Sequence, residues 1–120
     1  DNISPAMAAQ QKGIPFTFHQ DAPVIQPNMM ETIWCAVNRK TRGGVQLGET
    51  QRISVADALK AVTLHAAYQY GEEAKKGSIA PGKLADFVLL EENPLETAEE
   101  KLKQIKVLQT IFRGKTIYIR

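Results

Sequence analysis

The sequence has few of the features that mark secreted, membrane or disulfide-stabilised proteins. One of its 120 residues is a cysteine, which excludes an intrachain disulfide and a structural zinc site built on several cysteines. No apolar run approaches the roughly 20 residues that cross a bilayer, and no signal peptide is visible. We therefore expect a cytoplasmic protein that has no membrane as a partner.

An excess of charge of one sign is also lacking. Lys and Arg number 15 against 13 Asp and Glu, and the formal net charge is +2. A balance this close to zero gives no electrostatic reason to expect nucleic acid as a partner. Hydrophobic residues make up 43% of the chain, enough for one globular core at this length. Because the chain starts at Asp1 without a methionine, we expect a piece excised from a longer protein.

The first 76 residues are mainly helical in pattern. Ser4 followed by proline predicts a helix over about 5–12. Alternating apolar and polar side chains over Phe16–His19 predict a short strand, with Asp21 at its C-terminal end. Asn28 with a glutamate three residues later predicts the start of an amphipathic helix that runs to about residue 40. Ser54 is expected to cap another helix, which ends or bends at Gly71.

From residue 77 the pattern changes to short strands. We predict a buried strand over Leu84–Leu90, a charged helical turn or two over Thr97–Gln104, and a hairpin that turns around Arg113-Gly114-Lys115. The sequence therefore predicts an α+β fold, divided into a helical portion, 1–76, and a strand-rich portion, 77–120.

Gly77–Lys83 has the spacing G-x-x-x-x-G-K of a phosphate-binding loop. Such a loop needs Ser or Thr next, a strand before it and a helix after it. Here Leu84 follows, a helix precedes, a strand comes after, and Pro81 removes one backbone N–H donor. The segment instead suits a type II turn with Pro81-Gly82 at its centre and Lys83 pointing to solvent.

His19 and Asp21 are two residues apart at a strand end, so both can project from one face. Imidazole and carboxylate are good ligands for zinc, nickel or iron. Two ligands do not make a site, however, and the spacing alone favours Asp21 as a cap of the following turn. His65, the other histidine, is expected to be partly buried and structural. Cys35 is expected to be a small packed residue in its helix.

The order of several segments resembles the C-terminal end of the amidohydrolase superfamily, in particular its N-substituted formamide deformylase-like, amidohydrolase-3 branch. The matching segments are Phe16–Val24, Ala58–Ala67, Gly77–Val88, Asn93–Leu95 and the final hairpin. The pattern G-S-I-x-P-G-K-x-A-D before an apolar run is the most specific of them. The resemblance covers the chain from about residue 4 to residue 119.

This resemblance implies a (β/α)8 barrel with a small β-sandwich domain. It also implies one or two divalent metals at the barrel mouth, of which zinc is the metal we expect. Asp21 falls at the end of the eighth strand, where the family's carboxylate binds metal and takes a proton from the attacking water. The remaining metal ligands of the family come from earlier strands, which this chain does not contain. The family has a small polar residue at position 19. A histidine there would contact the metal ligands without binding the metal, or it would lie in the substrate pocket. The role of His65 is left open.

We therefore predict the last strand and helices of a metal-dependent amidohydrolase barrel in 1–76, and C-terminal strands of the composite β-sandwich in 77–120. The parent enzyme would hydrolyse a non-peptide C–N bond of a small amide, formamide or cyclic amide. The isolated chain is expected to be inactive, to bind no metal tightly, and to self-associate, most simply as a homodimer that buries Trp34. The alternative is a non-enzymatic α+β interaction module derived from the same family.

Overall fold

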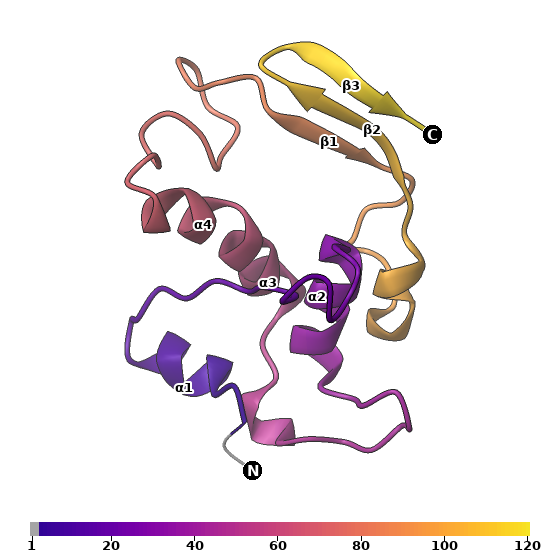
Figure 1. The fold of residues 1–120 in the computed structure, drawn as a ribbon. Coiled ribbons are helices and arrows are strands. Elements are labelled where there is room, and N and C mark those ends of the chain that lie inside the picture. Colours follow the sequence, from indigo (N-terminus) through magenta and orange to yellow (C-terminus); the bar gives the residue numbers. More distant parts are fainter. Residues whose placement is uncertain (1–2) are drawn as a thin grey trace.

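A computed structural model describes residues 3–120 of the chain. Its helices lie together on one side, and its sheet lies on the other (Figure 1). The elements in chain order are α1 (Ala6–Gln11), α2 (Met29–Asn38), the 3-10 helix η1 (Glu49–Gln51), α3 (Val55–Val62), α4 (Leu64–Gln69), β1 (Phe87–Leu90), the 3-10 helix η2 (Glu99–Gln104), β2 (Val107–Phe112) and β3 (Lys115–Ile119). This order confirms the predicted change from helices to strands after residue 76.

Capping side chains explain where the two longest helices begin. The Asn28 side chain accepts hydrogen bonds from the backbone N–H groups of Met30 (3.1 Å) and Glu31 (3.2 Å) at the start of α2. Ser54 Oγ accepts from the N–H of Asp57 (3.1 Å) at the start of α3. These bonds satisfy amide donors that the first turn of a helix leaves free. Ser4 provides no such bond, because Pro5 is the N-cap of α1 and no side chain caps that helix.

The predicted helix after Ser54 is divided in two by Thr63. The backbone there leaves the helical region, with φ −123° and ψ −85°, so α3 ends at Val62 and α4 starts at Leu64. Thr63 Oγ1 donates to the carbonyl of Leu59 at 2.7 Å, a local bond that competes with helical geometry. The chain after α4 turns at Gly71, whose φ is +67°, as the sequence predicted for the helix end.

The core lies between helices rather than under the sheet. Ile33 and Val37 of α2, Ala58 of α3 and Leu102 of η2 are each at most 1% exposed. The predicted helical turn at 97–104 thus exists as η2, and its Leu102 is buried against α2. Contacts between α2 and η2 join the helical portion of the chain to the strand-rich portion.

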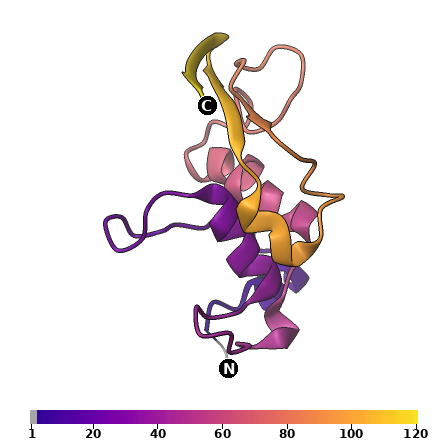
Figure 2. The ribbon, with the colours of Figure 1, turned by 90° about the vertical axis from the view of Figure 1, so that its right-hand side faces the viewer.

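The sheet is antiparallel with the order β1-β2-β3, and each neighbouring pair contains one irregularity in register. The hairpin around Arg113-Gly114 is as predicted. The strand predicted over Leu84–Leu90 starts only at Phe87, and it is not buried, since Val88 is 54% exposed. The sheet extends beyond the helices (Figure 2), and Val88, Leu89 and Ile117 are among its exposed side chains.

The turn around Pro81-Gly82 is present, with Lys83 N–H donating to the carbonyl of Ala80 at 3.2 Å. The prediction that Lys83 points to solvent was wrong. Its ammonium donates to the Glu73 carbonyl and, at 2.7 Å, to Ser78 Oγ. Lys83 therefore ties the loop after α4 together, a structural role that differs from that of a phosphate-loop lysine.

Candidate functional site

Asp21 follows an extended segment, residues 14–20, that connects α1 to the turn before α2. The predicted strand over Phe16–His19 was wrong, because residues 14–20 pair with no strand in the described part of the chain. A strand needs a neighbour for its backbone hydrogen bonds, and sequence alternation alone does not supply one. The turn that follows the segment, residues 21–27, is exposed throughout and projects sideways from the helices (Figure 2).

The Asp21 carboxylate is exposed and makes no hydrogen bond or ion pair with any of residues 3–120. The turn is held instead by its backbone, since the Asp21 carbonyl accepts from the N–H of Val24 at 2.8 Å. Asp21 itself has a φ of +55°, and the bond between Ala22 and Pro23 is cis. The carboxylate therefore does not cap the turn, and its oxygens are available to a ligand.

His19 is also exposed, beside a shallow hollow of about 160 Å³ that Glu31 and Cys35 help to line. These three side chains do not form a metal centre. Within residues 3–120, no three His, Cys, Asp or Glu side chains lie close enough together to hold an ion. The donors present thus fit the role of one or two ligands in a larger set rather than a complete site.

The prediction that Cys35 is packed inside its helix was wrong, because the residue is exposed. Neighbouring protein atoms nevertheless desolvate the sulfur, and the charge of Glu31 adds to this effect, so the pKa of the Cys35 thiol is raised above its ordinary value of 9.0. A raised pKa leaves little thiolate at neutral pH. The chemistry of a nucleophilic cysteine is not favoured here.

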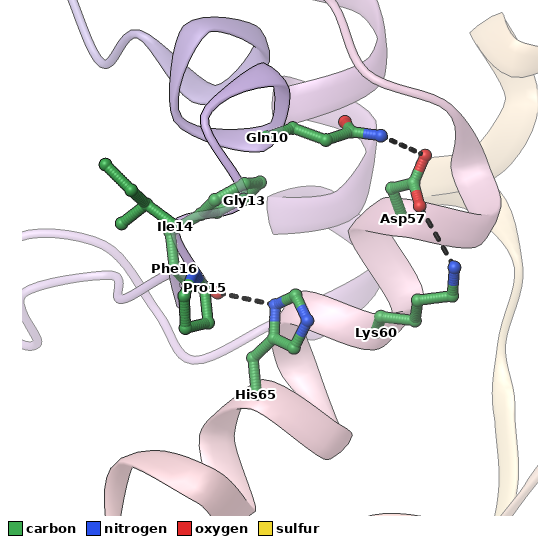
Figure 3. A pocket seen from close by; sticks show the side chains of 8 residues that line it. All are labelled: Gln10, Gly13, Ile14, Pro15, Phe16, Asp57, Lys60 and His65. Atoms are coloured by element: carbon green, nitrogen blue, oxygen red, sulfur yellow. Dashed lines mark hydrogen bonds and ion pairs between the residues drawn. The ribbon is translucent and has the colours of Figure 1, made fainter.

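A second polar cluster lines a hollow of about 360 Å³ between α1, α3 and α4 (Figure 3). Asp57 accepts from Gln10 Nε2 at 2.9 Å and pairs with Lys60 at 3.2 Å. The Ser54 hydroxyl donates to the same carboxylate, and this bond is the main reason that the pKa of Asp57 is lowered from 3.8. No local spacing predicts the whole cluster, because Gln10 belongs to α1 whereas Asp57 and Lys60 belong to α3.

His65 lies at the edge of the same hollow and is partly buried, as predicted. Its Nδ1 is 3.1 Å from the carbonyl oxygen of Phe16, and its ring meets the Phe16 ring edge-on, with centroids 6.1 Å apart. The neighbouring hydroxyl of Thr17 donates to Gln69 Oε1 at 2.9 Å. Farther along, Gln20 Nε2 donates to Thr32 Oγ1 at 2.6 Å. The structure therefore brings His65 to the segment that precedes Asp21.

Comparison with known proteins identifies the family whose sequences this chain matches. The model of the amidohydrolase family matches residues 1–118. The N-substituted formamide deformylase of Arthrobacter pascens is 28% identical over 118 residues, which cover 98% of this chain and 22% of that enzyme. The imidazolonepropionase of Pseudomonas paraeruginosa is 54% identical over 69 residues, which cover 52% of this chain and 17% of the relative. The chain thus spans about a fifth of the length of these curated relatives.

Among solved structures, the guanine deaminase of E. coli has a similar fold. The match has a TM-score of 0.68 and 23% sequence identity, and it covers 95% of this chain and 30% of the deaminase chain. None of the helices in the described residues is both long enough and apolar enough to cross a membrane.

Proposed function

The chain belongs to the amidohydrolase family, as the match over residues 1–118 shows, and on that premise we propose that it is the C-terminal portion of a metal-dependent hydrolase of non-peptide C–N bonds. In this proposal, 1–76 are the last strand and helices of a (β/α)8 barrel, and 77–120 are strands of a β-sandwich domain. The fold similarity to guanine deaminase over 95% of the chain supports such an origin. So does the extended segment at 14–20, which has no neighbouring strand among residues 3–120.

Asp21 is the residue to which we assign the chemistry. The observation that carries this assignment is its free carboxylate at the end of an extended segment, in a chain that matches the family from end to end. A carboxylate left without a protein partner does nothing for the fold, whereas it is a good ligand for a divalent cation. Asp21 would supply one ligand to a divalent metal, for which zinc is the expected identity. The other ligands would come from parts of the protein outside this chain.

A divalent metal, when bound, lowers the pKa of water toward about 7 and so provides a nucleophile at neutral pH. The Asp21 carboxylate would accept the proton that the water loses and pass it to the departing nitrogen, which must leave as an amine. His19, exposed two residues earlier, would face the small-molecule substrate or the neighbours of the metal ligands. Substrates of this class are amides, N-substituted formamides and cyclic amides.

The test uses the protein in its full natural length, purified with bound metal and supplied with a panel of these three substrate types. We expect hydrolysis of at least one type, loss of activity after treatment with a chelator, and recovery when zinc is restored. Full activity in the metal-free protein would contradict metal dependence. The absence of hydrolysis across the panel, together with a gene that begins near Asp1, would favour the non-enzymatic interaction module instead.

A further inference from the structure

Within the described residues of this chain, the extended segment before Asp21 is held by side chains, because no strand there pairs with it. Within the described residues, no backbone–backbone hydrogen bond involves residues 15–20. Its interactions are instead with two helices: α4 near its start, and α2 near its end, where Gln20 donates to Thr32. Any shift of the segment on these helices would move the Asp21 carboxylate.

Two residues of α4 contact consecutive positions of the segment. His65 Nδ1 bonds to the carbonyl of Phe16 (3.1 Å), and Gln69 accepts from the hydroxyl of Thr17 (2.9 Å). His65 and Gln69 are four residues apart, so they lie one above the other on one face of the helix. The edge-on contact between the His65 and Phe16 rings adds a third interaction at the same place.

The bond to Phe16 also fixes which nitrogen of His65 carries hydrogen. A carbonyl oxygen only accepts, so Nδ1 must be the donor and Nε2 of the neutral ring must be the acceptor. Figure 3 shows Nε2 on the side of the ring that faces Lys60. Protonation of His65 adds a hydrogen to Nε2 and leaves the Nδ1–H donor in place, so the link to Phe16 is kept in both charge states.

We propose that His65 is a positioning residue, which acts with Gln69 to hold the segment before Asp21 in place for catalysis. This role rests on the proposed function of Asp21. It assigns to His65 a contribution through the Phe16 carbonyl and no contact with substrate or metal. This role does not need a charge on His65. It needs a hydrogen-bond donor at the position of Nδ1.

Two substitutions separate the donor from the rest of the ring. His65→Asn places an amide nitrogen where the ring has Nδ1, and so keeps the bond to Phe16. His65→Gln extends its amide toward the position of Nε2 and loses that bond. Both remove the aromatic ring and the titratable group, and they differ mainly in where the donor lies. Tyr70→Ala is the control, because this side chain is 75% exposed at the end of α4 and makes no hydrogen bond to the segment.

The first readout uses the chain alone and needs no activity. We expect nitrogen NMR to show hydrogen on Nδ1 of His65. Amide order parameters of residues 16–20 should be about 0.85 in the parent, His65→Asn and Tyr70→Ala chains, and below about 0.6 in His65→Gln. Equal order parameters in the Asn and Gln variants, or hydrogen on Nε2 alone, would overturn the proposal.

The second readout is turnover by the full-length protein. His65→Gln should lower kcat by roughly 100-fold with KM nearly unchanged, since a misplacement of about 1 Å has an effect of that size. His65→Asn should restore most of it. If Asp21→Asn abolishes turnover while His65→Gln does not lower it, His65 has no positioning role. If Asp21→Asn is fully active, the proposed function fails, and the order parameters still decide whether His65 holds the segment.

Discussion

Two aspartates of this protein, Asp57 and Asp21, differ in the hydrogen bonds that their side chains make. Asp57 has three side-chain partners and lies at the start of α3. Asp21 has none within residues 3–120. Both are aspartates near the start of a turn or helix, so residue type and local position do not distinguish a structural role from a ligand-binding one. The structure assigns Asp57 to stability and leaves Asp21 available for chemistry.

Ser54→Ala tests the stabilising group. The change removes the N-cap of α3 and should lower the free energy of unfolding by about 1 kcal/mol. It should also raise the pKa of Asp57 toward its ordinary value, because the Ser54 bond is the largest cause of the lowered pKa. Ser4→Ala is the control, since no side chain caps α1, and it should leave stability unchanged in urea denaturation.

The pH dependence of this effect has a definite sign. A carboxyl whose pKa is lower in the folded state than in the unfolded state stabilises the fold above the unfolded value. For Asp57 the contribution is therefore complete well above pH 3.8 and is lost as pH falls through the lowered folded pKa. The stability difference between parent and Ser54→Ala should shrink as the medium is acidified below pH 3.8. A difference that grows on acidification would contradict this account.

At the scale of elements, local signals in the sequence were sufficient for most helices and for the hairpin. The caps at Asn28 and Ser54 and the turn at Arg113-Gly114 depend on residues within four positions of one another. The strand expected over Phe16–His19 failed because a strand requires a partner from elsewhere in the chain. The burial expected for Leu84–Leu90 failed in part: Phe87 and Leu90 are half-buried and Leu90 packs against the core, whereas Val88 and Leu89 are exposed.

The candidate site divides in the same way. Asp21 was chosen from the sequence, because the segments around it resemble a family whose carboxylate lies at that place; the structure adds that its side chain is exposed, and its role stays a prediction. The contacts of His65 with Phe16 and of Gln69 with Thr17 join residues about fifty positions apart. No spacing rule within a single sequence reaches that far, so only the structure could show that α4 holds this segment.

The close approach of the loop after α4 to that helix gives a prediction about Gly77. A Cβ at this position would lie 2.6 Å from the Cβ of Ala67 and 3.0 Å from the Thr63 carbonyl oxygen, and its φ is +88°. Gly77→Ala should therefore destabilise the protein by about 2–4 kcal/mol, from backbone strain and overpacking together.

Gly82→Ala is the matched control for that measurement. Its φ is nearly the same, +86°, but a Cβ there meets no atom within 4 Å. It should cost only the strain of the left-handed backbone, about 1 kcal/mol. Equal losses of stability in the two variants, measured by thermal unfolding, would show that the contact of Gly77 with Ala67 has no energetic weight.

For the whole molecule, the distribution of metal-binding side chains predicts weak zinc binding by the 120-residue chain. Asp21 and His19 are exposed, and within residues 3–120 they gain no third ligand. A tight zinc site has three or four protein ligands. Calorimetry should give a dissociation constant well above the micromolar range. Submicromolar binding that His65→Ala abolishes would contradict this prediction and would indicate a local metal site.

The open surfaces of the chain lead to a prediction of self-association. Trp34, which we expect in the dimer interface, is half-buried and contacts η2 within the chain: its indole N–H donates to the Glu100 carbonyl (3.1 Å), and Lys103 lies 4.1 Å from its ring centroid. Residues 15–20 make no backbone–backbone hydrogen bond within the described residues, and many side chains of the sheet are exposed. Open strand-like edges pair with other chains, so we expect a two-fold dimer at micromolar concentration.

Sedimentation of the chain checks that expectation. His19→Lys adds a positive charge to residues 14–20. It should shift the population toward monomer, because lysine on a strand edge opposes pairing. Glu96→Gln, an exposed change far along the sequence, is the control. A parent chain that stays monomeric, with Trp34 protected from quenching, would contradict the dimer prediction and would show that the chain packs into a fold of its own.

The role of Asp21 as proton acceptor is tested by the turnover of the full-length protein carrying Asp21→Asn, compared with Glu96→Gln, which removes another exposed carboxylate. If Asp21 accepts a proton in the reaction, its loss should lower kcat by at least about 100-fold, the usual contribution of a general base. The melting temperature should stay nearly unchanged, since the Asp21 carboxylate makes no bond within the described residues. Glu96→Gln should leave both quantities as they are. Near-normal turnover in Asp21→Asn would contradict the assignment.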